Sequence, residues 1–297
     1  MAEPDDLYTL RTLFWLGNYQ RVPVEASSLN RLPEALRIEV KEFVYRSYIA
    51  MGQHSIVLDE IKDAPGTPVS LQAVKLLARY LSDPSSKELV LMTLGEWLAD
   101  PGSAGNSSLQ LIAAVIYMHE NNTKDALKTI RHGTTMEQLA LNIQIYLKMD
   151  RPDLATKQVR LMQQADEDAT LTQLSLAWTY LATGGKKLQE AAFIYEELID
   201  KFGPTTSLLN GVAVANMHMG KFDEAEKTLQ NALQQGPNDP DTLVNLISCY
   251  QHLSKPSELI QRHINQLRSG APNNPMVQQL NTVEGAFDRV AGTYALN

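Results

Sequence analysis

The chain contains a single cysteine, Cys249, among its 297 residues. One thiol cannot form a disulfide within the chain, and this composition suits a reducing compartment such as the cytosol. Cys249 falls on an apolar helical stripe with Leu246 and Tyr250. We therefore expect a buried, unreactive thiol in preference to a nucleophile.

Positive charge is also scarce, because 26 lysines and arginines face 34 aspartates and glutamates, which gives a formal net charge of -8. Nucleic acids and anionic membrane surfaces both attract basic proteins, so neither is an expected ligand. The longest apolar run extends only from Leu111 to Met118, whereas a membrane-spanning helix needs about 20 residues. The acidic segment 1–6 does not resemble a signal peptide. Membrane association is therefore expected only through a partner.

The histidines do not form a recognisable metal motif. No His-Glu-x-x-His arrangement is present, and no second cysteine could complete a zinc site. His119, His218 and His252 occupy equivalent positions near helix ends, which leaves a metal ladder conceivable. Ordinary polar helix ends are the favoured interpretation, and we predict no metal.

Catalytic motifs are equally scarce. Residues 184–187 lack the spacing of a phosphate-binding loop, and no Gly-x-Ser-x-Gly nucleophile elbow occurs. The carboxylates of residues 166–168 could serve acid–base chemistry, but they are better explained as favourable charges at the start of a helix. We predict that the protein is not an enzyme and holds no cofactor.

The clearest positive feature is a helical hairpin over residues 206–239. Gly220 separates two predicted helices, the second opening at about Phe222, and Pro237 ends the second. Ala225, Leu229 and Ala232 form one stripe of that second helix. This pattern is typical of a tetratricopeptide repeat, a helical hairpin of about 34 residues.

The hairpin pattern recurs along the chain. Positions equivalent to Ala225 are occupied by Ala126, Ala155, Ala191 and Leu259, each after a polar turn and before an amphipathic helix. One such hairpin cannot bury its apolar face alone, so stacked neighbours are expected to form a continuous core.

The sequence therefore predicts an all-α fold, a tetratricopeptide-like solenoid with a right-handed superhelix. It would form a single domain over residues 1–297, and the periodicity leaves open whether the superhelix closes on itself. Degenerate repeats are expected over 7–100 and regular repeats over 109–268, with a loop over 100–108 between them. Ser86 is expected to cap the helix that follows Asp83-Pro84. A capping helix is expected over 275–293, with an apolar stripe of Val277, Leu280, Val283, Phe287 and Val290.

The candidate partner-binding residues lie on the first helix of each repeat, which lines the concave side of such solenoids. None of them is charged: Leu111, Val115, Met118, Ala140, Gln144, Leu147, Ser175, Thr179, Asn210, Val214, Met217, Val244, Ser248 and Gln251. The alternative is that these side chains pack against neighbouring repeats, and for Leu111 and Val115 the two interpretations are nearly balanced. Without Lys or Arg, this surface does not suit a clamp for a C-terminal carboxylate. It suits a protein segment held by apolar burial and backbone hydrogen bonds.

Several segments that a generic repeat does not dictate resemble the epsilon subunit family of coatomer, the COPI vesicle coat. They are residues 57–62, 71–74, 166–174 with Trp178, 184–189, 208–211 and 287–289. The resemblance spans nearly the whole chain, and residues 166–174 are its most specific part.

This resemblance implies a noncatalytic coat subunit that binds and stabilises the C-terminal domain of the coatomer alpha subunit, with the repeats reported as a ring around a protruding hairpin. It implies indirect contact with the other coatomer subunits and no cofactor. An Arf-class GTPase would recruit the coat to Golgi membranes for Golgi-to-ER and intra-Golgi transport. The alternative from the residues alone is a cytosolic adaptor or cochaperone that binds short peptide segments.

Overall fold

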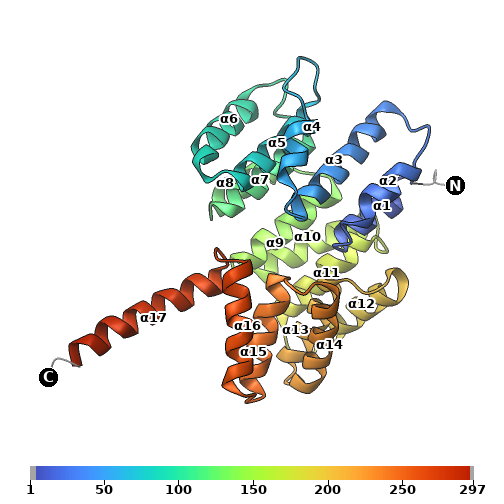
Figure 1. Ribbon diagram of the computed structural model, residues 1–297. Helices are drawn as coiled ribbons and strands as arrows, with labels where there is room; N and C mark the ends of the chain where they lie inside the picture. Colours follow the sequence, from blue (N-terminus) through green and yellow to red (C-terminus); the bar gives the residue numbers. More distant parts are fainter. Residues whose placement is uncertain (1–4, 295–297) are drawn as a thin grey trace. The chain divides into compact units, whose positions relative to one another are not determined.

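The computed structural model describes residues 5–294, and this part of the chain is helical throughout its regular structure (Figure 1). The prediction of an all-α fold is confirmed. The helices are α1 Tyr8–Trp15, α2 Arg21–Ser28, α3 Glu34–Ala50, α4 His54–Glu60, α5 Val69–Ser82, the 3-10 helix η1 Pro84–Ser86, α6 Lys87–Ala99, α7 Ser107–His119, α8 Thr123–Ile130, α9 Met136–Lys148, α10 Pro152–Ala165, α11 Thr170–Thr183, α12 Lys187–Phe202, α13 Thr206–His218, α14 Phe222–Gln235, α15 Pro240–His252, α16 Ser257–Gly270 and α17 Pro275–Tyr294.

The chain divides into two compact units, and the boundary lies between α11 and α12. The N-terminal unit ends at Thr183 and the C-terminal unit begins at Gly184. In both units, consecutive helices pack as hairpins, such as α7 with α8, α9 with α10, and α13 with α14. The single solenoid over residues 1–297 stays a prediction, as do its division into degenerate repeats over 7–100 and regular repeats over 109–268 and the capping role of 275–293.

The hairpin of α13 and α14 forms as the sequence predicts. The Thr205 side chain accepts a hydrogen bond from the backbone N–H of Leu208, which satisfies a free donor at the start of α13. Gly220 follows the end of α13 and has a φ of 77°. Glycine adopts this left-handed conformation without strain. The stripe of Ala225, Leu229 and Ala232 on α14 is fully buried. At the positions equivalent to Ala225 in other repeats, Ala126, Ala155 and Ala191 are also fully buried, while Leu259 is half-buried.

One glycine allows close packing of α12 against α13. A Cβ atom at Gly211 would lie 2.5 Å from Cε1 of Tyr195, a residue that is only 3% exposed. We expect Gly211→Ala to lower the free energy of unfolding by about 1 kcal/mol, because overpacking outweighs the higher helix propensity of alanine. Urea unfolding followed by circular dichroism measures this change.

The matched control is Gly285→Ala on α17, where an added Cβ meets no atom within 4 Å. This variant is expected to gain up to about 1 kcal/mol of helix stability. A Gly211→Ala protein at least as stable as the parent would show that Tyr195 yields and that the close approach is not needed.

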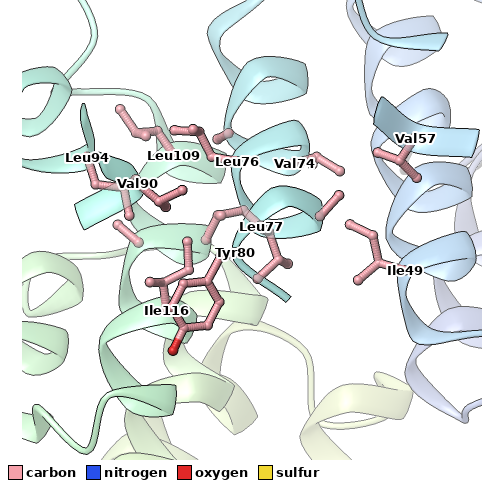
Figure 2. Close-up of a cluster of buried hydrophobic side chains, with 14 of the residues drawn as sticks. Ile49, Val57, Val74, Leu76, Leu77, Tyr80, Val90, Leu94, Leu109 and Ile116 are labelled. Atoms are coloured by element: carbon pink, nitrogen blue, oxygen red, sulfur yellow. The ribbon is translucent and has the colours of Figure 1, made fainter. Parts of the chain in front are cut away.

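The N-terminal unit is built around α5, whose side chains are buried on nearly every side. Figure 2 shows Val74 and Leu77 of α5 within a cluster that includes Val57 of α4, Val90 of α6 and Leu109 of α7. Because α3, α4, α6 and α7 all contact α5, almost no side of this helix faces solvent. A helix in such a position needs apolar residues on several sides, which explains why Leu, Ala and Val predominate in α5.

Local predictions differ in their outcome. The loop expected over 100–108 is a turn region, and α7 begins inside it at Ser107 with Asn106 as its cap. The prediction that Ser86 caps α6 was wrong. Its hydroxyl donates to the carbonyl oxygens of Arg79 and Asp83, and the Asp83 side chain instead accepts the backbone N–H of Ser85.

Candidate protein-binding surfaces

The predicted first-helix residues lie on α7, α9 and α11 of the N-terminal unit and on α13 and α15 of the C-terminal unit. A buried subset consists of Leu111, Ala140, Ser175, Thr179 and Asn210. An accessible subset consists of Val115, Met118, Gln144, Leu147, Val214, Met217, Val244, Ser248 and Gln251, all half-buried or exposed. Packing within the repeats therefore accounts for the buried subset. Partner binding by the accessible subset stays a prediction.

Asn210 illustrates how a predicted surface residue is used inside the repeats. Its amide nitrogen donates to the Thr242 hydroxyl at 2.7 Å, and its amide oxygen accepts from Asn245 at 2.9 Å. Thr242 in turn donates to Asp239 at 2.6 Å. These bonds join α13 to α15, so the polar groups of Asn210 are satisfied by the neighbouring repeat.

The sequence did not reveal a cavity of about 660 Å³ in the N-terminal unit, where α1, α3, α7 and α9 meet. Glu137 lies in the first turn of α9, which begins with a capping box formed by Thr135 and Gln138. Its carboxylate accepts two hydrogen bonds from Arg46 of α3, at 2.7 and 2.9 Å, and a third from the Trp15 indole at 3.2 Å.

The charged side chains in this cavity have polar partners, which are opposite charges for Arg11 and Arg46 and a hydroxyl for Glu42. Arg11 bonds Glu39 at 2.8 Å, and Glu42 accepts from Ser108 at 2.7 Å. Burial raises the pKa of Glu42. Burial also acts to raise the pKa of Glu137, but the Arg46 charge and the hydrogen bonds outweigh it, so that pKa is lowered. The ion pairs and hydrogen bonds of these residues join the helices that meet at the cavity.

The other candidate chemical groups have structural explanations. Cys249 is fully buried, and its Sγ lies 3.3 Å from the Phe222 carbonyl oxygen; burial raises its thiol pKa. Gly184 and Gly185 have φ values of 73° and 59°, as a repeat turn requires. Asp166 accepts backbone N–H groups just before α11. Among residues 5–294, no three His, Cys, Asp or Glu side chains gather as metal ligands.

Helix α17 is present as predicted, but only the beginning of its apolar stripe is buried. Val277 is 2% exposed, whereas Val283 is 66%, Phe287 71%, Val290 57% and Tyr294 76% exposed. In Figure 1, α17 continues beyond α16 of the same unit, and no further repeat within residues 5–294 packs against its second half. The alternating spacing of three and four residues places these side chains on one face, as in a coiled-coil seam. No helix within residues 5–294 is long and apolar enough to cross a membrane.

Stacked helical hairpins of this length define a tetratricopeptide-repeat fold. A tetratricopeptide repeat protein from Parabacteroides merdae matches the structure with a TM-score of 0.61 at 14% identity, over 88% of this chain and 96% of that one. This likeness concerns the fold alone.

Sequence comparison identifies the family. The family model described as coatomer epsilon subunit matches residues 3–295. Coatomer subunit epsilon-1 of Arabidopsis thaliana is 46% identical over 99% of both chains. Coatomer subunit epsilon of Dictyostelium discoideum is 39% identical over 96% of this chain and 97% of its own. The chain belongs to the coatomer epsilon subunit family.

Family membership confirms the resemblance found in the sequence. The protein is a structural component of the COPI vesicle coat rather than an enzyme, and other coatomer subunits are its partners.

Proposed function

We propose that this protein binds and stabilises the C-terminal domain of the coatomer alpha subunit and contacts the other coatomer subunits indirectly. Through this contact it would take part in Golgi-to-ER and intra-Golgi transport, as a cytoplasmic subunit peripheral to Golgi membranes and COPI-coated vesicles. The observation that carries the proposal is the accessible subset of first-helix residues, which contains no charged side chain in either unit.

The chemistry of that subset indicates the kind of contact. Met118, Leu147 and Met217 offer flexible apolar area, and Gln144 and Gln251 offer neutral hydrogen-bonding groups. Such faces bind a folded or extended segment by burying apolar side chains, and they have no cation that would select a carboxylate tail. A few residues are expected to supply most of the affinity.

The exposed stripe on α17 also supports assembly with another subunit. Contiguous exposed apolar side chains are uncommon on proteins that act alone and often mark an interaction site. Arg268 of α16 contacts this helix near its midpoint, through two hydrogen bonds to Glu284 at 2.6 and 2.7 Å. A partner that covers the stripe would meet a formed helix and would not have to order it.

Isothermal titration calorimetry with the alpha subunit's C-terminal domain tests the proposal. We expect tight binding by the parent protein and at least a tenfold loss in the double variant Leu147→Asp, Met217→Asp, because a carboxylate buried in an apolar contact is costly. Circular dichroism establishes that the variant keeps its helices. The absence of measurable binding by the parent would overturn the proposal.

A second pair of variants separates binding from folding. Gln144→Asp with Gln251→Asp changes exposed side chains of the same faces, so weaker binding cannot be attributed to disturbed packing. Gln164→Asp with Asn231→Asp introduces the same number of negative charges on the exposed sides of α10 and α14, the second helices. The first pair should weaken binding and the second should not. Equal affinity in both pairs would place the contact elsewhere.

A further inference from the structure

A second cavity of the N-terminal unit lies between α5, α6 and the loop that precedes α5, and we call it the α5–α6 pocket. It has a volume of about 500 Å³, and none of the predicted first-helix residues lines it. Cavities of this volume hold ligands or anchor side chains in many proteins. It is also separate from the cavity around Glu137.

The interior of the pocket is apolar. Val90 is fully buried and Leu76 is 8% exposed, and both belong to the cluster drawn in Figure 2. Trp97 is half-buried and Leu89 is 52% exposed, so both offer unused apolar surface beside this floor. A large aromatic side chain next to aliphatic ones is a common anchor point in protein recognition.

Helix α6 has more apolar residues than its packing requires. Val90 and Leu94 face the core, whereas Leu89 and Met92 lie 52% and 57% exposed on other sides. A surface helix normally has a polar outer face, so apolar residues on both sides indicate a helix that is covered on both sides when it functions. The surplus surface adjoins the pocket through Leu89.

The rim of the pocket is positively charged. The Lys75 ammonium lies 2.9 Å from Asp63, and the Lys75 side chain is only 11% exposed. Arg79 also lines the pocket, and its guanidinium forms no hydrogen bond or ion pair with any residue between 5 and 294. Its charge acts only weakly on Asp83, which Ser85 holds mainly through hydrogen bonds. The rim thus combines two cations with one carboxylate, in a protein whose net charge is -8.

We propose that the α5–α6 pocket binds a short acidic and apolar peptide segment of another protein. A bulky apolar side chain of that segment would lie against Leu76, Leu89 and Trp97. A neighbouring Asp or Glu would form a bidentate ion pair with Arg79, whose planar guanidinium matches a carboxylate. This contact is independent of the proposed binding to the alpha subunit, because the two surfaces share no residue.

Selection from a displayed library of random peptides of about 12 residues, with the full-length protein as bait, identifies such segments. We expect the enriched peptides to combine Leu, Phe, Met or Trp with Asp or Glu, and we expect Arg79→Glu to abolish their enrichment. A selection that returns no consensus, a basic consensus, or a consensus retained by Arg79→Glu would overturn the proposal.

Fluorescence polarisation with the most enriched peptide then measures each contact. Arg79→Ala and Leu89→Ser should each weaken binding about tenfold or more. Arg160→Ala, which removes an exposed arginine of α10, is the matched control and should bind as the parent does. Unchanged affinity in Arg79→Ala and Leu89→Ser would contradict the assigned site. Titration with the alpha subunit's domain separates the two proposals, because these variants should keep their affinity for it.

Discussion

Replacing Glu137 with alanine is expected to lower the free energy of unfolding by about 3 kcal/mol, which is the lower part of the range for breaking a buried ion pair. The side chains of Arg46 and Glu137 are 16% and 21% exposed, so most of each is shielded from solvent. The Arg46 guanidinium would stay over the rings of Phe14 and Phe43, 4.5 and 5.2 Å from their centroids, without the carboxylate that accepts its two hydrogen bonds.

Urea unfolding at pH 7 followed by circular dichroism measures this loss. Asp153→Ala is the control, because it breaks an exposed ion pair with Arg151 and should cost less than about 1 kcal/mol. The double variant Arg46→Met, Glu137→Met removes both charges and should recover most of the lost stability. If Glu137→Ala cost no more than Asp153→Ala, the pair would contribute nothing to the fold.

The same pair makes a pH-dependent contribution of defined sign. The pKa of Glu137 is lowered in the folded protein from an ordinary value of 4.5, so folding favours the ionised form. The contribution is fully present above the pKa of the unfolded chain and disappears as the pH falls through the folded pKa. The stability difference between parent and Glu137→Ala should therefore be large at pH 7 and should shrink below about pH 4.

Truncation of Leu229 should have a comparable effect in the C-terminal unit. Its side chain is fully buried in a cluster with Ala213 of α13 and with Leu246, Cys249 and Tyr250 of α15. Leu229→Ala is expected to lower the free energy of unfolding by about 3 kcal/mol, because the lost apolar burial is combined with a cavity that the repeats cannot close.

Leu161→Ala is the matched control, because the same atoms are removed from a side chain that is 48% exposed on α10. It should cost less than about 1 kcal/mol. Chemical denaturation of both variants measures the difference. Equal losses would show that α14 does not depend on its buried stripe, contrary to the repeat interpretation.

Local patterns predicted most of the fold. The stripe of Ala225, Leu229 and Ala232 and the break at Gly220 depend on neighbours within one hairpin, so helical periodicity and glycine conformation identify them. The recurring small residues extend the same inference to the other repeats. The pattern of Val283 and Phe287 predicted a helix correctly, but periodicity alone does not reveal whether an apolar face is covered.

Contacts between distant residues could not be predicted in this way. Arg46 and Glu137 are 91 residues apart, and neither stands in a motif that would relate them. Asn210 fills a repeat position that faces outward in an ideal hairpin, yet its partners 32 and 35 residues later draw it into the interface between repeats. The α5–α6 pocket likewise depends on how helices pack, which the sequence pattern does not specify.

The uncovered stripe on α17 should limit the steady-state amount of this protein that is not bound to a partner. A chain without a partner displays Val283, Phe287, Val290 and Tyr294 together, and exposed apolar side chains of this kind are what chaperones and proteases bind. Copies in excess of a covering subunit would then be removed faster than assembled ones. Turnover would then match the number of these subunits to the number of their partners.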